Sequence, residues 1–380
     1  MNVHGLTVDR GGCFYYRIRQ PLADMRSRGN WTSWGNGIDA ETFSRADVIV
    51  GQYLHLEETV QQWKTWRDAG DKLLVWEADD DITAVLENEA AGSAYRDPET
   101  VPRMLDMLSA SHLCTVTTPA LAEVYRPYQR NVAVLPNLVP QWLLDAPVPC
   151  RREGAPLRVG YTASKSHSED FYWWSGIWSK WMAKNSYRAM LVLAGPGARP
   201  EGMPTTWRVE SIRWRKDTQD YLRMLPGFAD VGIAPLLDTK FSRGKSPIKA
   251  LEYAAAGIPC IASDHPVYRN VVIPGVTGFL CRTQKDWLDA LSLMVIDEEL
   301  RRAMSVAAKE HARRFAMNSG YWLHEYYRTA EAEGIVVKGE RVGCCRADSG
   351  GGRGRRGYGR CGTGGSSDGR GACAGGTRGS

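Results

Sequence analysis

Residues 243–263 read RGKSPIKALEYAAAGIPCIAS and contain, in succession, a loop, a helix, a helix stop and a buried strand. Ser246 is a preferred N-cap, and Pro247 suits the first helical position because its φ is fixed near the helical value. Residues 248–256 are largely good helix formers. Gly257 can adopt the left-handed conformation that ends a helix, and the proline two positions later prevents its continuation. We therefore predict a helix of roughly three turns that begins at Pro247.

A short apolar run, residues 258–262, follows this helix. Such a run, bounded by turn residues, is typical of a strand buried on both faces of a parallel sheet. Helix N-termini in these sheets bind anions, because their first N–H groups have no partner within the helix and the helix dipole is positive there. The segment therefore predicts an α/β sheet with an anion site at the start of the helix.

Three cations lie close to the helix start, namely Arg243, Lys245 and Lys249, and together they suit a diphosphate. Glu252 follows Lys249 by one turn on the same face, where its carboxylate can accept hydrogen bonds from a pair of hydroxyls. This combination favours a nucleotide diphosphate with its ribose. The alternative interpretation is an ordinary amphipathic helix with a solvated Lys–Glu pair.

The same stretch resembles the nucleotide-sugar motif of the GT-B glycosyltransferases, in particular of the family "glycosyl transferases group 1". The family pattern is a glutamate followed by A-x-G-x-P-x-[IV]-A-S, and the matching positions are Glu252, Ala255, Gly257, Pro259, Ile261, Ala262 and Ser263. The resemblance implies that Glu252 binds the ribose of the donor. The family often has a second glutamate eight residues upstream, and this chain has Gly244 at that position.

At 380 residues and 43% hydrophobic content, the chain is long enough for two α/β domains with cores of their own. It has no run of about 18 apolar residues and no apolar signal-peptide segment near its N-terminus. We therefore expect a cytoplasmic protein without a transmembrane segment, and the sequence leaves peripheral contact with a membrane open. The nine cysteines lack the spacing of a zinc site, which favours isolated thiols.

The N-terminal part alternates strands with helices, which predicts a parallel sheet. Residues 1–8 suit a first strand, and the Gly11-Gly12 turn after it opens a helix. In GT-B enzymes the loop after the first strand borders the cleft. The resemblance therefore implies that Gly12 and the nearby Arg17 face the donor or the acceptor.

Three carboxylates, Asp79, Asp80 and Asp81, follow the apolar strand expected at residues 72–77. The carboxyl end of such a strand is where open α/β sheets place their ligands. One carboxylate could act as a base or hydrogen-bond partner for an acceptor hydroxyl, or the cluster could hold a divalent ion. A third interpretation is capping of a helix over residues 83–88. Because GT-B enzymes generally need no metal bound through Asp-x-Asp, we favour the acceptor role and expect no metal site.

The second domain is expected to open with a strand at residues 157–161, followed by Lys165 and His167. Residues at this first strand-helix junction are placed to touch phosphate. Family members commonly carry arginine and lysine here, so the resemblance implies donor contact by both side chains, although an isolated histidine is more often structural.

The chain thus predicts five segments. They are an N-terminal Rossmann-like acceptor domain (1–138), a proline-rich linker (139–156), a Rossmann-like nucleotide-sugar domain (157–315), a helix crossing back to the first domain (316–340) and a tail (341–380). The tail has eight Arg, two Asp and almost no aliphatic side chains, so the rest of the chain carries a net charge of −1. Such a composition predicts disorder. Arg-Gly segments can bind RNA by charge and stacking, but we expect a passive extension.

We therefore expect a GT-B fold, with two Rossmann-like domains whose parallel sheets face a central cleft, and a disordered C-terminal tail. The resemblance implies transfer of a sugar from a nucleotide diphosphate sugar to an acceptor hydroxyl, with retention of configuration and without a cofactor or metal. Alternatives are a nucleotide-sugar epimerase of the same fold, or a nucleic-acid-binding protein that uses the basic tail. The expected donor-binding residues are Gly12, Lys165, His167, Arg243, Lys245, Ser246, Lys249 and Glu252; the expected catalytic residues are Asp79, Asp80, Asp81 and Lys249.

Overall fold

The computed structural model describes residues 1–8, 10–85, 92, 95–148, 154–195, 204 and 206–338. The described residues up to Lys338 belong to one compact unit. The expected disordered tail, residues 341–380, lies outside the described residues, as does the end of the helix expected over residues 83–88. Within the described part, none of the cysteines forms a disulfide.

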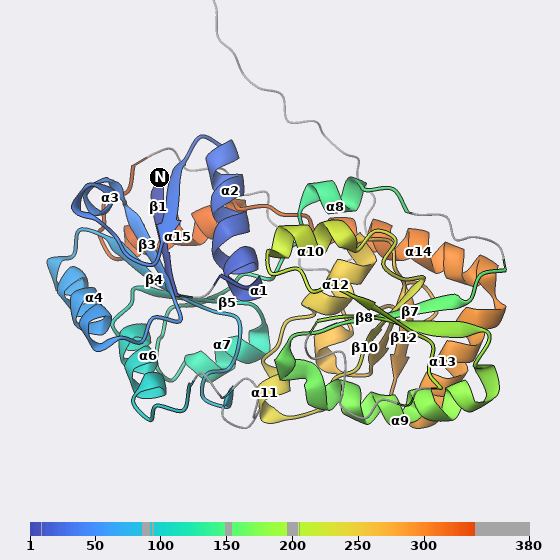
Figure 1. Cartoon of the computed structure of the whole chain (residues 1–380). Helices are drawn as coiled ribbons and strands as arrows, with labels where there is room; N and C mark the ends of the chain where they lie inside the picture. Colours follow the sequence, from blue (N-terminus) through green and yellow to red (C-terminus); the bar gives the residue numbers. More distant parts are fainter. Residues whose placement is uncertain are drawn as a thin grey trace, which may run out of the picture. The chain divides into compact units, whose positions relative to one another are not determined.

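Six parallel strands form the first sheet, in the order β2-β1-β3-β4-β5-β6 (Figure 1). Their bounds are β1 Asn2–Thr7, β2 Trp31–Gly35, β3 Val48–Gln52, β4 Leu73–Ala78, β5 Leu113–Val116 and β6 Val132–Val134. Both β3 and β4 are buried along their whole length, which explains their continuous apolar sequence. β2 was not predicted, because this edge strand is only partly buried and its sequence gives little periodic signal.

The helices of this half are α1 Gly12–Phe14, the π-helix Tyr15–Arg19, α2 Gln20–Ser27, α3 Ala40–Arg45, α4 Glu57–Ala69, α6 Thr100–Ser109 and α7 Pro119–Tyr125. The helix that follows, α8 Gln141–Asp145, packs against the second half. Local chemistry sets several of their ends. α4 stops at Gly70, whose φ of 70° lies in the left-handed region. α7 begins with Pro119 after Thr118, whose hydroxyl accepts the N–H of Leu121.

The second sheet is also parallel, in the order β12-β11-β10-β7-β8-β9. Its strands are β7 Leu157–Thr162, β8 Ala189–Ala194, β9 Val209–Ile212, β10 Val231–Ala234, β11 Cys260–Ser263 and β12 Gly278–Cys281. Its helices are α9 Ser168–Asn185, α10 Thr218–Met224, α11 Lys240–Arg243, α12 Ile248–Ala255, α13 Gln284–Ile296 and α14 Glu298–Ala312. The alternation of strand and helix therefore produces a parallel sheet in each half, as predicted.

The helix at the centre of the sequence motif, α12, starts one residue later than predicted and is shorter. Pro247 occupies the N-cap position, and the Ser246 hydroxyl does not cap the helix because it accepts a hydrogen bond from Asn137 at 2.9 Å. The predicted stop is confirmed: Gly257 has a φ of 75°, and the N–H of Ile258 returns to the carbonyl of Tyr253.

The last described helix, α15 (Gly320–Ala332), packs against the first sheet (Figure 1). Its side chains Trp322 and Tyr326 belong to the same buried apolar cluster as Val3 and Val75. Among the described residues, no helix combines the length and the apolar character needed to cross a membrane.

Strand order positions the site. In the second sheet the order reverses between β7 and β10, and in the first sheet it reverses between β1 and β3. At such a switch point the loops that leave the two strands diverge, which opens a crevice at the carboxyl ends of the strands. The loops after β1 and β3, and after β7 and β10, leave their sheets at these points, and the loop after β4 lies at the same carboxyl edge of the first sheet.

Candidate functional site

A cleft of about 440 Å³ is lined by residues from both sheets. The first half contributes the loops after β1 and β4, including Gly12 and Asp80. The second half contributes the loop after β7 and the start of α12, including Lys249. These are the carboxyl ends of parallel strands, where the topology predicts a ligand site.

Lys249 is the least compensated charge in the cleft. Its side chain projects from the first turn of α12 and is 7% exposed, and its ammonium has no hydrogen-bond partner among the described residues. The ammonium lies 4.4 Å from the centre of the Tyr161 ring, which offers a cation–π contact. Burial lowers the pKa of Lys249 to about 8. A buried cation without an acceptor, beside a helix N-terminus, is suited to an anionic ligand.

Glu252, one turn further along α12, accepts hydrogen bonds from two phenols. Tyr16 of the first half donates to Oε1 at 2.5 Å, and Tyr221 of α10 donates to Oε2 at 2.8 Å. Burial raises the pKa of Glu252 to about 7, even though both phenols and Lys249 act in the opposite direction. The motif glutamate therefore lines the cleft as expected, with one hydrogen bond on each oxygen.

Lys245 lies in the loop before α12 and forms an ion pair with Asp80 at 3.1 Å. Burial tends to lower the pKa of Lys245, but the charge and hydrogen bond of Asp80, together with Cys13 and Asp79, outweigh it and raise that pKa. The ammonium also lies 4.3 Å from the centre of the Phe241 ring. The donor motif is thus tied directly to the carboxylate loop of the first half.

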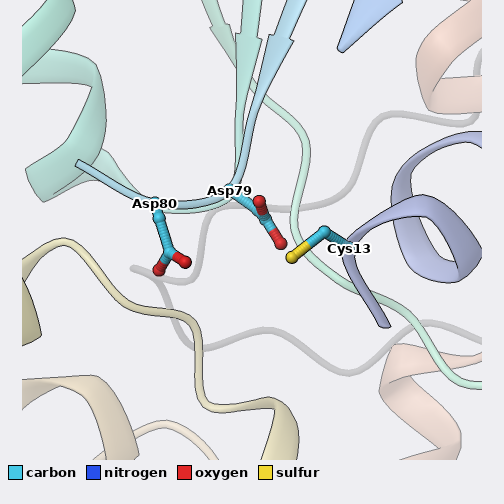
Figure 2. A group of neighbouring side chains, drawn as sticks. All are labelled: Cys13, Asp79 and Asp80. Atoms are coloured by element: carbon cyan, nitrogen blue, oxygen red, sulfur yellow. The ribbon is translucent and has the colours of Figure 1, made fainter. Parts of the chain in front are cut away.

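Asp79 and Asp80 line the cleft together with Cys13. One ligand atom from each of the three residues lies within 4.8 Å of the others, and Figure 2 shows the Asp79 carboxylate turned toward the Cys13 sulfur. Tyr53 donates a hydrogen bond to Asp79. Desolvation and the neighbouring charge of Asp80 raise the pKa of Asp79.

Asp81 is not part of this group. Its side chain is buried outside the cleft and accepts hydrogen bonds from the N–H and the hydroxyl of Thr83, at 2.8 and 2.6 Å. The catalytic role predicted for Asp81 therefore has no support in its position. Its geometry is the local turn-capping arrangement that aspartate commonly forms.

His167 lines the cleft at the start of α9, as predicted from the strand-helix junction. Its Nδ1 is 2.8 Å from Oδ2 of Asp170, and the other oxygen of Asp170 accepts the N–H of Leu237 at 2.8 Å. Burial, followed by the charge of Lys249, lowers the pKa of His167 to about 4.

Two predicted donor-binding residues are not brought into the cleft. Arg243 is exposed and forms an ion pair with Asp238 at 2.7 Å, because it ends the short helix α11 on the outer side of the loop. Lys165 is exposed and does not line the cleft, although its neighbours Ser164 and Ser166 do. Arg17, which was expected near the ligand, is fully buried in an ion pair with Glu77 at 2.6 Å.

Gly244, where the family often has a second glutamate, lies close to the first half. A Cβ at this position would lie 3.2 Å from Leu121 and 3.3 Å from the Asp81 Cβ, both in the first half. The Thr118 hydroxyl also donates to the Gly244 carbonyl at 3.2 Å. A longer side chain at this position would require Leu121 and Asp81 to shift, and the next residue, Lys245, pairs with the Asp80 carboxylate of the first half.

Sequence reasoning missed the partners of the motif residues: Tyr16, Tyr221, Asn137, Asp170 and Tyr53. It also missed Trp214, Arg215 and Lys216, which line the cleft from the segment before α10. The cluster of cations around Trp214 is visible in the sequence as RWRK at residues 213–216, so composition could have indicated it. The tyrosines carry no comparable signal.

Residues 213–311 match the family model described as "Glycosyl transferases group 1". The match includes α12 and the motif that follows Glu252, so the resemblance predicted from this motif is confirmed. Two curated relatives are D-inositol 3-phosphate glycosyltransferases, from Corynebacterium jeikeium and Saccharomonospora viridis. They are 33% identical over 116 residues and 28% identical over 142 residues. These alignments cover 30% and 34% of this chain, and 26% and 32% of the relatives, so the chain matches about a third or less of their length.

Three solved structures share the architecture of nearly the whole chain. Anabaena Alr3699/HepE in complex with UDP-glucose has a TM-score of 0.57 at 13% identity, covering 87% of this chain and 99% of its own. Sucrose-phosphate synthase from Thermosynechococcus elongatus has a TM-score of 0.56 at 14% identity, covering 87% and 98%. WaaG, a glycosyltransferase involved in lipopolysaccharide biosynthesis, has a TM-score of 0.53 at 14% identity, covering 89% and 100%. The predicted GT-B fold, with two parallel-sheet α/β domains, is confirmed.

Proposed function

We propose that this protein transfers a sugar from a nucleotide diphosphate sugar to the hydroxyl group of an acceptor. The observation that carries the proposal is the buried, unpartnered ammonium of Lys249 at the N-terminus of α12, in one cleft with the carboxylate of Glu252. A diphosphate would supply the missing acceptor atoms for Lys249, and a ribose would supply hydroxyl donors for Glu252. The match of residues 213–311 to the group 1 family supports the same assignment.

Lys249, Lys245 and the first N–H groups of α12 would stabilise the charge that develops on the departing diphosphate. When the bond between the anomeric carbon and the phosphate oxygen breaks, the oxygen keeps the electron pair and its negative charge grows. Cations and backbone dipoles that are already fixed in a water-poor cleft stabilise such charge without reorganising. Lys249 would therefore contribute to the rate of turnover as well as to donor binding.

Glu252 would hold the ribose while keeping part of its present hydrogen bonding. An ionised carboxylate offers about four acceptor positions, and the two phenols occupy two of them. The remaining positions can accept ribose hydroxyls, so nucleotide binding does not require both tyrosines to leave.

Asp79 and Asp80 are the candidates for the acceptor side, since they line the cleft and Asp81 does not. Either carboxylate could accept a hydrogen bond from the attacking hydroxyl. We further propose that the reaction needs no metal. A divalent ion at Cys13, Asp79 and Asp80 would compete with the Lys245 ammonium on Asp80 and with the Tyr53 hydroxyl on Asp79. The resemblance to group 1 enzymes extends the proposal to retention of the anomeric configuration.

Radiolabelled nucleotide sugars, incubated with and without acceptors, test the proposal. The Anabaena neighbour was solved with UDP-glucose and the curated relatives are named for D-inositol 3-phosphate, so UDP-sugars and inositol phosphates are the first compounds to test. We expect product only when an acceptor is present, no effect of a chelator, and loss of product in Lys249→Ala but not in Lys184→Ala, which removes an exposed lysine of α9. Formation of an epimeric sugar without an acceptor would instead establish an epimerase.

A further inference from the structure

We propose that His167 gains a proton when the donor binds and then donates a hydrogen bond from Nε2 to the diphosphate, as a third cation beside Lys245 and Lys249. This inference rests on the proposed function, because it takes the occupant of the cleft to be a nucleotide diphosphate. It assigns to His167 a contact with a phosphate oxygen and a change of charge during the binding step.

The geometry fixes which ring nitrogen is available. A carboxylate only accepts hydrogen bonds, so the contact of Nδ1 with Asp170 Oδ2 at 2.8 Å requires Nδ1 to carry a proton. Asp170 cannot easily turn away, because its other oxygen accepts the N–H of Leu237. A neutral His167 therefore has its lone pair on Nε2. His167 lines the cleft and Asp170 does not, which leaves Nε2 as the nitrogen for a ligand.

Burial, followed by the charges of two lysines, keeps His167 neutral. Lys249 of α12 and Lys245 of the loop before α12 repel a second positive charge, whereas Asp170 on its own helix favours one. Tyr161 of β7 donates its hydroxyl to the backbone carbonyl of His167 at 3.2 Å and adds no charge. Desolvation and the two lysines together keep the pKa of His167 near 4.

A bound diphosphate reverses this balance. Its negative charges pair with Lys245 and Lys249, which removes the repulsion that they exert on the imidazole. An opposite charge within about 4–6 Å also raises the pKa of a histidine by roughly one to three units. Asp170 already holds Nδ1–H, so the added proton can only enter at Nε2, facing the ligand. Binding of the nucleotide sugar would therefore cause His167 to become protonated, and the protonated ring would then donate a hydrogen bond to the diphosphate.

Such a group has a direct use in transfer. As the anomeric carbon–oxygen bond breaks, the leaving phosphate oxygen keeps the electron pair, and the imidazolium Nε2–H stabilises it by a charge-assisted hydrogen bond. When the nucleotide diphosphate leaves, the lysines again repel the imidazolium, which returns its proton to water. The acceptor oxygen forms the new bond to the anomeric carbon, and its proton passes to Asp79 or Asp80 and from there to water, so protons and charge balance over one turnover.

Isothermal titration calorimetry counts the protons. UDP, GDP and ADP are tested first, and the tightest ligand is titrated at pH 6.5 in two buffers with different ionisation enthalpies. At this pH Lys249 is already largely charged, since its pKa is about 8. We expect the wild type to take up more protons per nucleotide than His167→Asn, up to about 0.8 proton if the pKa of His167 rises by three units, and the variant to bind about tenfold more weakly. Subtracting the variant cancels the titration of the nucleotide, of Glu252 and of Lys249.

Two further variants sharpen the result. His324→Asn removes an exposed histidine of α15 and should match the wild type. Asp170→Asn keeps the shape but removes the charge that favours the imidazolium, so it should take up fewer protons than the wild type. Equal melting temperatures without nucleotide verify that each variant folds. If wild type and His167→Asn bind the nucleotide with equal proton uptake, the inference is wrong while the donor site stands. If none of the three nucleotides binds, the donor site and the inference fall together.

Discussion

The ammonium of Lys245 lies 3.1 Å from the carboxylate of Asp80, although 165 positions separate them in the sequence. Lys245 belongs to the loop that starts the donor motif, and Asp80 belongs to the loop that ends β4. Each side chain fixes the other at the boundary between the two halves of the cleft. An acceptor hydroxyl that approaches Asp80 would therefore meet a carboxylate already oriented toward the donor phosphates.

Replacing Asp80 and Asp81 singly with Asn should separate catalysis from stability. Asp80→Asn removes the partner of Lys245 in the cleft, so we expect turnover to fall at least tenfold with little change in melting temperature. Asp81→Asn weakens a local turn, so we expect a loss of stability of about 1 kcal/mol and near-normal turnover at low temperature. Steady-state kinetics and thermal melts of both variants check this, and equal kinetic defects would contradict the division between them.

Glu252→Gln should weaken nucleotide binding while preserving shape. Hydrogen bonds to a charged group are worth about 1.5–3 kcal/mol, so we expect affinity for the nucleotide diphosphate to fall about tenfold or more. Calorimetry at pH 8, where Glu252 is ionised, measures the effect. The exposed Glu299→Gln is the matched control. The corresponding nucleoside, which lacks phosphates, should lose affinity for Glu252→Gln and be nearly indifferent to Lys249→Ala. If both variants bound the nucleotide diphosphate with wild-type affinity, the proposed location of the donor site would be wrong.

Nucleotide affinity should fall at high pH because Lys249 loses its proton. The pKa of Lys249 is lowered by burial to about 8, and the protonated form attracts phosphate. Affinity should therefore be retained below pH 8 and fall by up to tenfold per pH unit above it, until the pKa of the complex is reached. Lys249→Arg keeps its charge throughout this range, so its affinity should stay level. A wild-type titration without the decline would show that Lys249 does not meet the phosphates.

Arg17→Met should destabilise the fold rather than the reaction. Arg17 and Glu77 are both fully buried and lie 2.6 Å apart, and removing one partner of such a pair typically costs about 3–5 kcal/mol. The pKa of Glu77 is already raised by burial to about 7, and losing Arg17 raises it further. When a carboxyl has a higher pKa in the folded state than in the unfolded state, the protein loses stability as the pH rises above the unfolded pKa, here about 4.5. Urea unfolding of the variant should therefore show decreasing stability from pH 5 to 8.

The double variant Arg17→Met, Glu77→Gln is the control for this interpretation. It removes both charges, so we expect it to recover part of the lost stability and to lose the added dependence on pH. A double variant as unstable and as sensitive to pH as the single one would show that packing around Arg17, and not its charge, is responsible.

Local sequence chemistry determined the elements and their order. Continuous apolar runs predicted the buried strands β3 and β4, and Gly257 ended α12 where its left-handed φ was expected. The placement of Lys249 and Glu252 on one helix face followed from their spacing of three residues, and both line the cleft. These features depend on the chain within a few residues, so a single sequence contains the information.

Only the tertiary structure decided which of the neighbouring polar residues face the ligand. Asp79 and Asp80 line the cleft, whereas Asp81, the next residue, turns into a local loop. The Glu252 carboxylate meets Tyr16, which is 236 positions away, and Lys245 meets Asp80. Such contacts depend on the packing of two sheets and on the direction in which each loop leaves its strand. Neither is encoded in the spacing of the residues themselves, which is why the motif predicted the cleft but not the partners within it.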